Sequence, residues 1–177
     1  HAMPRLRRAL TIHQEIAKAR LYVTSRGVYE FYVNGQRVGD DWLNPGITQY
    51  NRTHLYQIYD VTPMLKVGEN AIGAILGEGW WSGGATFEGQ NWNYFGDRLS
   101  LLAKLTIHYK DGSVENIVTD PHSWKYSVDG ALIYSSLFQG EVYDARKDDR
   151  NWTTSGYADA TWKQAVVIPT IGHVSST

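Results

Sequence analysis

Short runs of β-branched and aromatic residues, separated by turns rich in glycine, asparagine and aspartate, follow one another along most of the chain. The clearest runs cover 21–23, 28–33, 55–59, 71–76 and 99–109. Residues of these types favour strands, and turns at this spacing predict roughly nine or ten short strands. The pattern leaves room for a single helical turn, at 64–66 after Pro63.

Three dipeptides in this pattern favour two-residue hairpin turns, in which both positions take a positive φ. They are Asn34-Gly35, Asp111-Gly112 and Asp129-Gly130. We predict that they join 31–33 to 36–38, 99–109 to 113–118, and 124–128 to 131–134. A sheet with one apolar face needs a second sheet to cover it, so the pattern predicts an all-β fold, an antiparallel, jelly-roll-like β-sandwich.

The length of 177 residues fits one domain. We expect a cloning remnant and N-terminal extension at 1–8, the sandwich at 9–168, and a C-terminal tail or linker at 169–177. The extension is basic at first, and a strand is expected through 9–12. No signal peptide is visible, so the sequence leaves the compartment open, with a secreted or periplasmic location as the hypothesis.

Charge and cysteine content exclude several classes of function. Lys and Arg number 17 against 18 Asp and Glu, a net charge of -1, which argues against sequence-independent binding to nucleic acid. The absence of cysteine excludes disulfide scaffolds, thiolate zinc sites and cysteine nucleophiles. Apolar runs are far shorter than the roughly 20 residues that span a bilayer, so no membrane partner is expected.

One segment does not fit a strand: residues 77–96 read GEGWWSGGATFEGQNWNYFG. Irregular loops longer than about 12–15 residues are usually functional or disordered. Its rings Trp80, Trp81, Trp92 and Tyr94 alternate with polar side chains, among them Asn93 and the adjoining Asp97. Aromatic faces pack on the C–H face of a sugar while polar groups bind its hydroxyls, which predicts a sugar site. The alternative is that the rings close the open end of the sandwich.

A second polar segment, 44–51, offers Gln49, Tyr50 and Asn51 to sugar hydroxyls. Oxygen-rich loops of this kind could also hold calcium, which prefers six to eight oxygen ligands. No helix-loop-helix calcium pattern is present, so such a site would need separate loops. The carboxylates Glu78, Glu88, Asp97, Glu141 and Asp144 are candidates for a glycosidase pair, but the sequence singles out no two of them.

Seven blocks occur in an order that resembles one known family. They are ARLYVT (19–24), VNGQRVGD (33–40), LNPGITQYN (43–51), YQIYDVT (56–62), GENAIG (68–73), LGEGWW (76–81) and FQGEVYDAR (138–146). Together they resemble the N-terminal β-sandwich domain of bacterial α-L-rhamnosidases over residues 9–168, nearly the whole chain. In the last block, Glu141 and Arg146 are interpreted as a pair across strands or as a tie to a following domain.

The resemblance implies a noncatalytic domain that precedes an (α/α)6 barrel carrying the catalytic carboxylates. It implies L-rhamnose or a rhamnose-containing plant glycan as ligand, the downstream catalytic domain as partner, and in some members a calcium ion near 49–52 and 93–99. Gln49 stands where an Asp is common and Tyr94 where an amide is expected, while Asn51, Asn93 and Asp97 could partly substitute as calcium ligands. Two alternatives stay open: a structural brace for the barrel, and a self-sufficient glycoside hydrolase.

Overall fold

The computed structural model describes residues 2–170 and 172–176, and nearly all of its regular structure is strand. The elements are β1 (Arg5–Ile12), β2 (Ile16–Arg26), β3 (Val28–Val33), β4 (Gln36–Arg37), β5 (Thr53–Asp60), η1 (Thr62–Met64), β6 (Gly68–Gly77), β7 (Ser100–Tyr109), β8 (Val114–Val118), β9 (Lys125–Ser127), β10 (Leu132–Ser136), β11 (Gly140–Tyr143), η2 (Ala145–Lys147), β12 (Lys163–Gln164) and β13 (His173–Ser176). In this part of the chain, no helix is long and apolar enough to cross a membrane.

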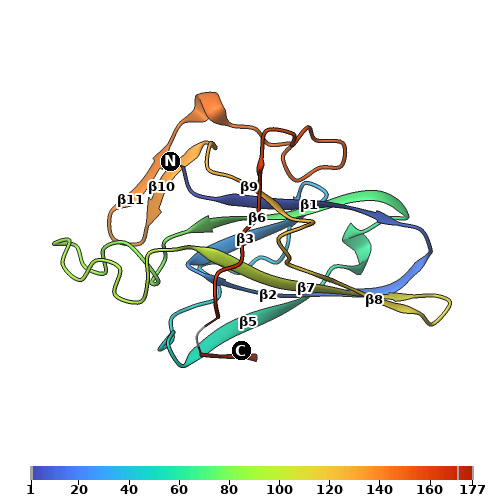
Figure 1. Cartoon of the computed structure of the whole chain (residues 1–177), viewed down its shortest axis with the longest axis horizontal. Helices are drawn as coiled ribbons and strands as arrows, with labels where there is room; N and C mark the ends of the chain where they lie inside the picture. The colour runs from blue at the N-terminus through green and yellow to red at the C-terminus, as the bar shows by residue number, and fades with distance from the viewer. Residues whose placement is uncertain (1, 171, 177) are drawn as a thin grey trace.

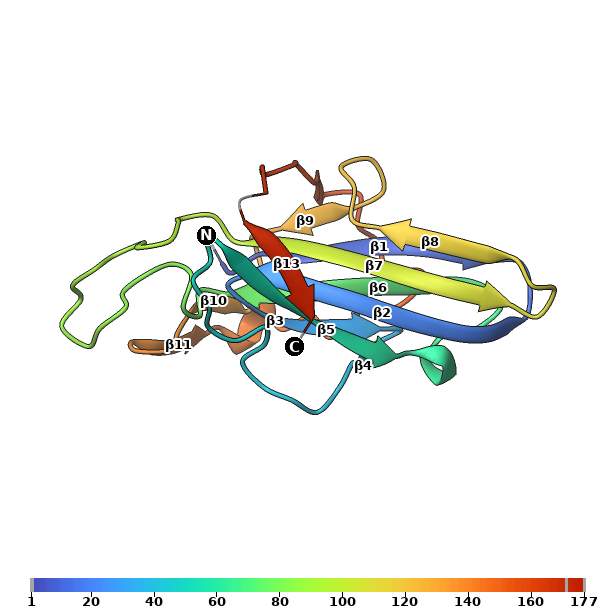
Figure 2. The same ribbon diagram turned by 90° about the horizontal axis from the view of Figure 1, so that it is seen from below.

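Two sheets lie face to face, with β1, β6 and β3 in one layer and β2, β7 and β5 in the other (Figure 1, Figure 2). The first sheet has the order β12-β9-β1-β6-β3-β4 and the second the order β13-β5-β2-β7-β8. All pairs are antiparallel except β13 with β5. The predicted all-β sandwich is therefore confirmed, and β13 adds a parallel strand inside the predicted tail.

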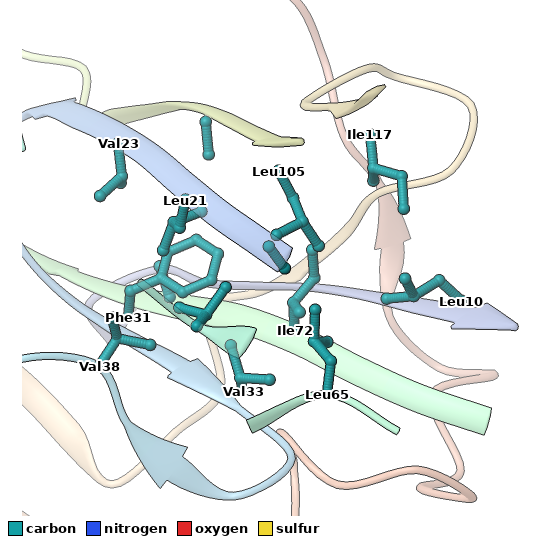
Figure 3. Close-up of a cluster of buried hydrophobic side chains, with 14 of the residues drawn as sticks. Leu10, Leu21, Val23, Phe31, Val33, Val38, Leu65, Ile72, Leu105 and Ile117 are labelled. Atoms are coloured by element: carbon teal, nitrogen blue, oxygen red, sulfur yellow. The ribbon is translucent and has the colours of Figure 1, made fainter. Parts of the chain in front are cut away.

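The core lies between the sheets, where every second side chain of a strand points inward. Burial along β3 alternates so that Tyr29, Phe31 and Val33 are buried, and β2 contributes Leu21 and Val23 in the same way. Side chains from both layers meet in one cluster (Figure 3). Each fully buried side chain of this size stabilises the fold by about 1.5–3 kcal/mol, so the alternation itself selects the two-layer arrangement.

Two of the three predicted hairpins form. Asn34 and Gly35 both take a positive φ, 49° and 81°, and β3 pairs with β4 around them. Strands β7 and β8 pair as well, although of the dipeptide only Gly112 has a positive φ. The predicted helical turn at 64–66 lies slightly earlier, as η1.

The prediction of a hairpin at Asp129-Gly130 is wrong. Strand β9 pairs with β1 and β12, while β10 pairs with β11, so the dipeptide connects two different sheets. The reason is that the N-terminal residues occupy the hydrogen bonds on either side: the amide of Ala2 donates to Val128 (2.8 Å) and that of Met3 to Leu132 (2.8 Å). Residues 2–3, set aside as a cloning remnant, are thus part of the fold, and β1 begins at Arg5 rather than at residue 9.

The outer face of the first sheet is partly covered by the segment after β11. Trp152 and Trp162 stack there with ring centroids 6.0 Å apart, and the guanidinium of Arg5 lies over both rings. Gly73 allows this approach, because a Cβ at this position would lie 2.8 Å from Cζ3 of Trp152. Arg146 pairs with Asp144 (2.8 Å), whereas Glu141 accepts a hydrogen bond from Ser135, so the predicted pairing of Glu141 with Arg146 is wrong.

Candidate functional site

The glycine-rich loop between β6 and β7 projects from one end of the sandwich (Figure 1, Figure 2). Two of its stretches face each other: Gly84 and Trp92 form an isolated antiparallel bridge. The amide of Asn93 donates to Gly83 O (2.9 Å), and the amide of Gly83 donates to Oδ1 of Asn93 (2.8 Å). The loop therefore has a defined, hairpin-like conformation rather than an open coil.

Trp81 holds the base of this loop against the sandwich. Its ring is 6% exposed and stacks on Phe95 at an interplanar angle of 18°. Its Nε1 donates to Arg98 O (3.0 Å), and the guanidinium of Arg26 lies 5.0 Å from the ring centroid. With its surface covered by protein, Trp81 occupies a structural position.

Tyr50 connects the loop to the segment 44–51. The ring is 2% exposed and meets Phe95 edge to face, with centroids 4.9 Å apart, and its hydroxyl donates to Gly46 O (2.8 Å). Burial raises the pKa of Tyr50 to about 12, so the phenol stays neutral at physiological pH. Through this contact the structure brings together the two segments, 49–51 and 93–97, that sequence reasoning assigned to one site.

Three rings of the loop face solvent instead. Trp92 is 56% exposed, Tyr94 75% and Phe87 82%. Trp92 and Tyr94 belong to the predicted set. Phe87 was missed, although its place in the same run of alternating aromatic and polar residues was a signal for it. These rings are the ones that a ligand can reach.

The hairpin of β10 and β11 supports the loop from the side. Trp80 is half-buried, and its ring and that of Phe138 form a T-shaped pair with centroids 5.5 Å apart. The ring of Phe87 forms a second T-shaped pair with Phe138, with centroids 5.1 Å apart. Nε2 of Gln139 donates to Thr86 O (3.0 Å). Trp80 therefore has one side committed to the hairpin.

The predicted polar residues Gln49, Asn51, Asn93 and Asp97 are all exposed. They fit a calcium ion poorly, because Asp97 is the only carboxylate among the predicted ligands and Oδ1 of Asn93 already accepts a hydrogen bond from Gly83. Within residues 2–170 and 172–176, no three His, Cys, Asp or Glu side chains gather in a way that could hold a metal ion. Their amide and carboxylate groups are suited to sugar hydroxyls.

Glu78 lies where the loop leaves β6. Its Oε2 is buried without a hydrogen-bond partner in the described part of the chain. Burial raises the pKa of this carboxyl group, and a hydrogen bond from Tyr134 opposes the rise only in part. The charged form of Glu78 is thus disfavoured in the folded state. The contribution of the protonated carboxyl group to stability is complete below the ordinary pKa of glutamate, and it is lost as the pH rises through the raised pKa of the folded state.

We therefore expect Glu78→Gln to raise the urea midpoint at pH 7, because the amide resembles the protonated acid in shape and carries no charge. At a pH below the ordinary pKa of glutamate, variant and wild type should unfold at the same urea concentration. Glu88→Gln, an exposed position in the same loop, is the matched control and should change neither value. A lower midpoint for Glu78→Gln at pH 7 would contradict the assignment.

Comparison with known proteins places these features in context. A family model described as alpha-L-rhamnosidase N-terminal domain matches residues 14–175. An α-L-rhamnosidase of Streptomyces avermitilis is 41% identical over 150 residues, 85% of this chain and 14% of that protein. One from Formosa agariphila is 35% identical over 171 residues, 96% of this chain and 18% of that protein. The chain thus spans less than a fifth of either relative.

Solved structures of rhamnosidases contain the same fold. The crystal structure of Streptomyces avermitilis alpha-L-rhamnosidase complexed with L-rhamnose matches with a TM-score of 0.86 and 39% identity, over 92% of this chain and 16% of that one. The structure of the native enzyme from Aspergillus terreus matches with a TM-score of 0.89 and 39% identity, over 96% of this chain and 20% of that one.

Proposed function

The chain belongs to the family of alpha-L-rhamnosidase N-terminal domains, and from this premise we propose that it is a noncatalytic module that binds L-rhamnose or a rhamnose-containing glycan. The observation that carries the proposal is the exposure of Trp92 and Tyr94 on a loop with a defined conformation, beside exposed amide and carboxylate groups. The relative from Streptomyces avermitilis, described as complexed with L-rhamnose, supports the choice of sugar.

The binding mode follows from the chemistry of a pyranose. One face of the ring carries C–H groups, which pack on the plane of Trp92 or Tyr94. The hydroxyls at the ring edge need directional partners, and the exposed side chains of Asn51, Asn93 and Asp97 offer donors and acceptors for them. A monosaccharide has few atoms and stays partly hydrated, so the dissociation constant should lie in the micromolar to millimolar range.

We expect Trp92→Ala and Tyr94→Ala each to weaken binding of methyl α-L-rhamnopyranoside, and the double variant to weaken it by about tenfold or more, since each ring contact contributes about 0.5–1.5 kcal/mol beyond its buried area. Isothermal titration calorimetry of the 177-residue chain measures this. Tyr22→Ala is the aromatic control, because Tyr22 lies in β2, in the second sheet and outside the loop. Unchanged affinity in the double variant would exclude the loop as the site.

The resemblance also implies a calcium ion between the sugar and the side chains of Asn51, Asn93 and Asp97. The same titration tests it when run with added calcium and with a chelator. Because the donor set is poor in carboxylates, we expect equal affinity in both. Binding that is lost in chelator and restored by calcium would assign a bridging role to the ion.

An interdomain brace is the second candidate function. The same exposed rings favour it, and so does the length of the chain, which spans only 14–18% of the Streptomyces and Formosa relatives. A ring cluster that projects from a sandwich is also suited to dock on a neighbouring domain. Absence of heat with methyl α-L-rhamnopyranoside and with rhamnosylated oligosaccharides would favour the brace over sugar binding.

For the noncatalytic assignment we expect no release of nitrophenol when the chain is incubated with 4-nitrophenyl α-L-rhamnopyranoside. The resemblance implies that the catalytic carboxylates belong to a following (α/α)6 barrel. Release above the buffer blank that disappears in Glu78→Gln or Asp97→Asn would identify a self-sufficient hydrolase.

A further inference from the structure

We propose that a second sugar-binding site, separate from the aromatic loop, lies on the outer face of the first sheet. A cavity of about 660 Å³ opens there, and none of the loop's exposed rings lines it. The outward side chains of β3, Val28, Glu30 and Tyr32, lie along it. The rest of the lining comes from Arg5 of β1, the end of β6 with Gly79, β4 with the loop after it, the stretch 131–143 that includes β10 and β11, and the stretch 148–153.

Two exposed rings line this cavity. Trp42, after β4, is 70% exposed, and Tyr143 of β11 is 55% exposed. The guanidinium of Arg37 lies 4.3 Å from the centroid of the Trp42 ring. Nη1 and Nη2 of Arg37 in turn donate to the carbonyls of Gly39 (2.8 Å) and Asp41 (2.5 Å). Trp42 is therefore held by its neighbours while most of its surface is free for a ligand, which lowers the entropy cost of binding.

Beside the rings, the cavity offers hydrogen-bond acceptors. Oε2 of Glu30 accepts from the hydroxyl of Tyr32 (2.6 Å), and the Glu30 side chain is still 37% exposed. The second oxygen of this carboxylate has no hydrogen bond within the described residues, so it can accept from a ligand hydroxyl. Glu141 is exposed as well, with one oxygen bonded to Ser135.

The charges of the lining select a neutral ligand. Four carboxylates line the cavity (Glu30, Glu141, Asp148, Asp149) against three guanidinium groups (Arg5, Arg37, Arg150), a formal balance of 3 − 4 = −1. All four carboxylates already have a partner. Besides the bonds of Glu30 and Glu141 given above, Asp148 pairs with Arg150 (2.9 Å), Asp149 accepts from the Tyr157 hydroxyl (2.5 Å), and Oε2 of Glu30 lies 3.9 Å from Nε of Arg37. A phosphate or a polyanion would gain little from such a lining.

A neutral pyranose matches each of these features. Its C–H face packs on an indole or phenol ring, and a carboxylate oxygen accepts hydrogen bonds from its hydroxyls. A cavity of this size holds one to two sugar rings within the usual range of small-ligand sites. When one branched glycan occupies both sites, binding at the second site is intramolecular. The overall affinity is then higher than that of either site alone, although neither site has changed its own contacts.

The test is a backbone amide NMR titration of the 177-residue chain with three neutral probes: methyl α-L-rhamnopyranoside, methyl β-D-glucopyranoside and methyl β-D-galactopyranoside. With at least one probe we expect saturable shifts at Glu30, Arg37, Trp42 and Tyr143. Trp42→Ala should raise the dissociation constant for these shifts by about tenfold, the scale of one lost ring contact. Glu30→Gln, which keeps the ring and the fold, should raise it less.

The variants separate this site from the aromatic loop. Trp92→Ala should leave the shifts in the cavity unchanged, and Trp42→Ala should leave those of the loop unchanged, so either site can fail alone. The proposal is overturned if none of the three probes gives saturable shifts in the cavity up to its solubility limit. It is also overturned if glucuronate or inorganic phosphate binds there more tightly than every neutral probe, or if Trp42→Ala, shown to be folded by its spectrum, binds as wild type does.

Discussion

Replacing Arg7 by methionine is expected to lower the free energy of unfolding by about 3–5 kcal/mol, because it removes one partner from a buried polar network. The Arg7 side chain is 1% exposed. Its Nε donates to Trp152 O (2.8 Å) and its Nη2 to Thr154 O (3.1 Å), while Nη1 pairs with the carboxylate of Asp159. Methionine fills much of the volume but removes the donor from the two carbonyl oxygens and from one carboxylate oxygen of Asp159, which keeps its ion pair with Lys125 (2.7 Å).

Urea unfolding followed by tryptophan fluorescence measures this loss, and Arg8→Met is the matched control. Arg8 is the next residue of β1, its side chain is 21% exposed, and its contact with Asp120 is 3.4 Å long. A partly exposed pair of this kind contributes about 0–1 kcal/mol. Equal losses in the two variants would show that the network around Arg7 does not hold the 152–159 segment in place.

The same network should make the fold sensitive to acid. Burial raises the pKa of Asp159, but Lys125 and Arg7 outweigh it and hold the pKa below its ordinary value. For an acid with a lowered pKa, the stabilisation is complete above the ordinary pKa and is lost as the pH falls through the folded value. In Arg7→Met the decline of the urea midpoint in acid should therefore be shallower than in wild type.

The second large effect is expected at Trp81. Truncation of a buried tryptophan to alanine costs about 3–5 kcal/mol, and here it removes the ring on which Phe95 and Tyr50 pack. The base of the aromatic loop would lose its attachment, so Trp92 and Tyr94 would no longer be held for a ligand. We expect Trp81→Ala to lower both the urea midpoint and the affinity for methyl α-L-rhamnopyranoside.

Trp92→Ala separates the two effects, since the same residue type is removed from the same loop at an exposed position. It should reduce binding while changing the free energy of unfolding by no more than about 0.5 kcal/mol. Hydrogen exchange of the amides at 81–99 gives an independent measurement: Trp81→Ala should accelerate exchange there, and Trp92→Ala should not. A Trp81→Ala variant that unfolds as wild type does would show that the ring is not needed to hold the loop.

Local patterns in the sequence were sufficient for most of the long strands and for some of their turns, but not for the start of β1 at Arg5 or for β13. Alternation within β3 follows from the geometry of a single strand, and the preference of Asn34-Gly35 for positive φ values is a property of these two residue types. Asp129-Gly130 has the same local preference but forms no hairpin, because residues 2–3 bond to Val128 and Leu132. That competition involves residues more than a hundred positions apart, which no local pattern contains.

For the candidate site too, one part follows from the residue types and the other from the tertiary structure. Residue types alone determined that this chain is a β-sandwich with one aromatic, glycine-rich loop, because strand formation and loop composition are properties of short segments. Only the tertiary structure decided that Trp81 and Tyr50 are buried while Trp92, Tyr94 and Phe87 face solvent. It also decided the burial of two arginines of the basic N-terminal run: Arg5 lies under Trp152 and Trp162, and Arg7 under the ring of Tyr157. Burial depends on which distant segment covers a side chain, and that is settled when the sheets and the loops pack together.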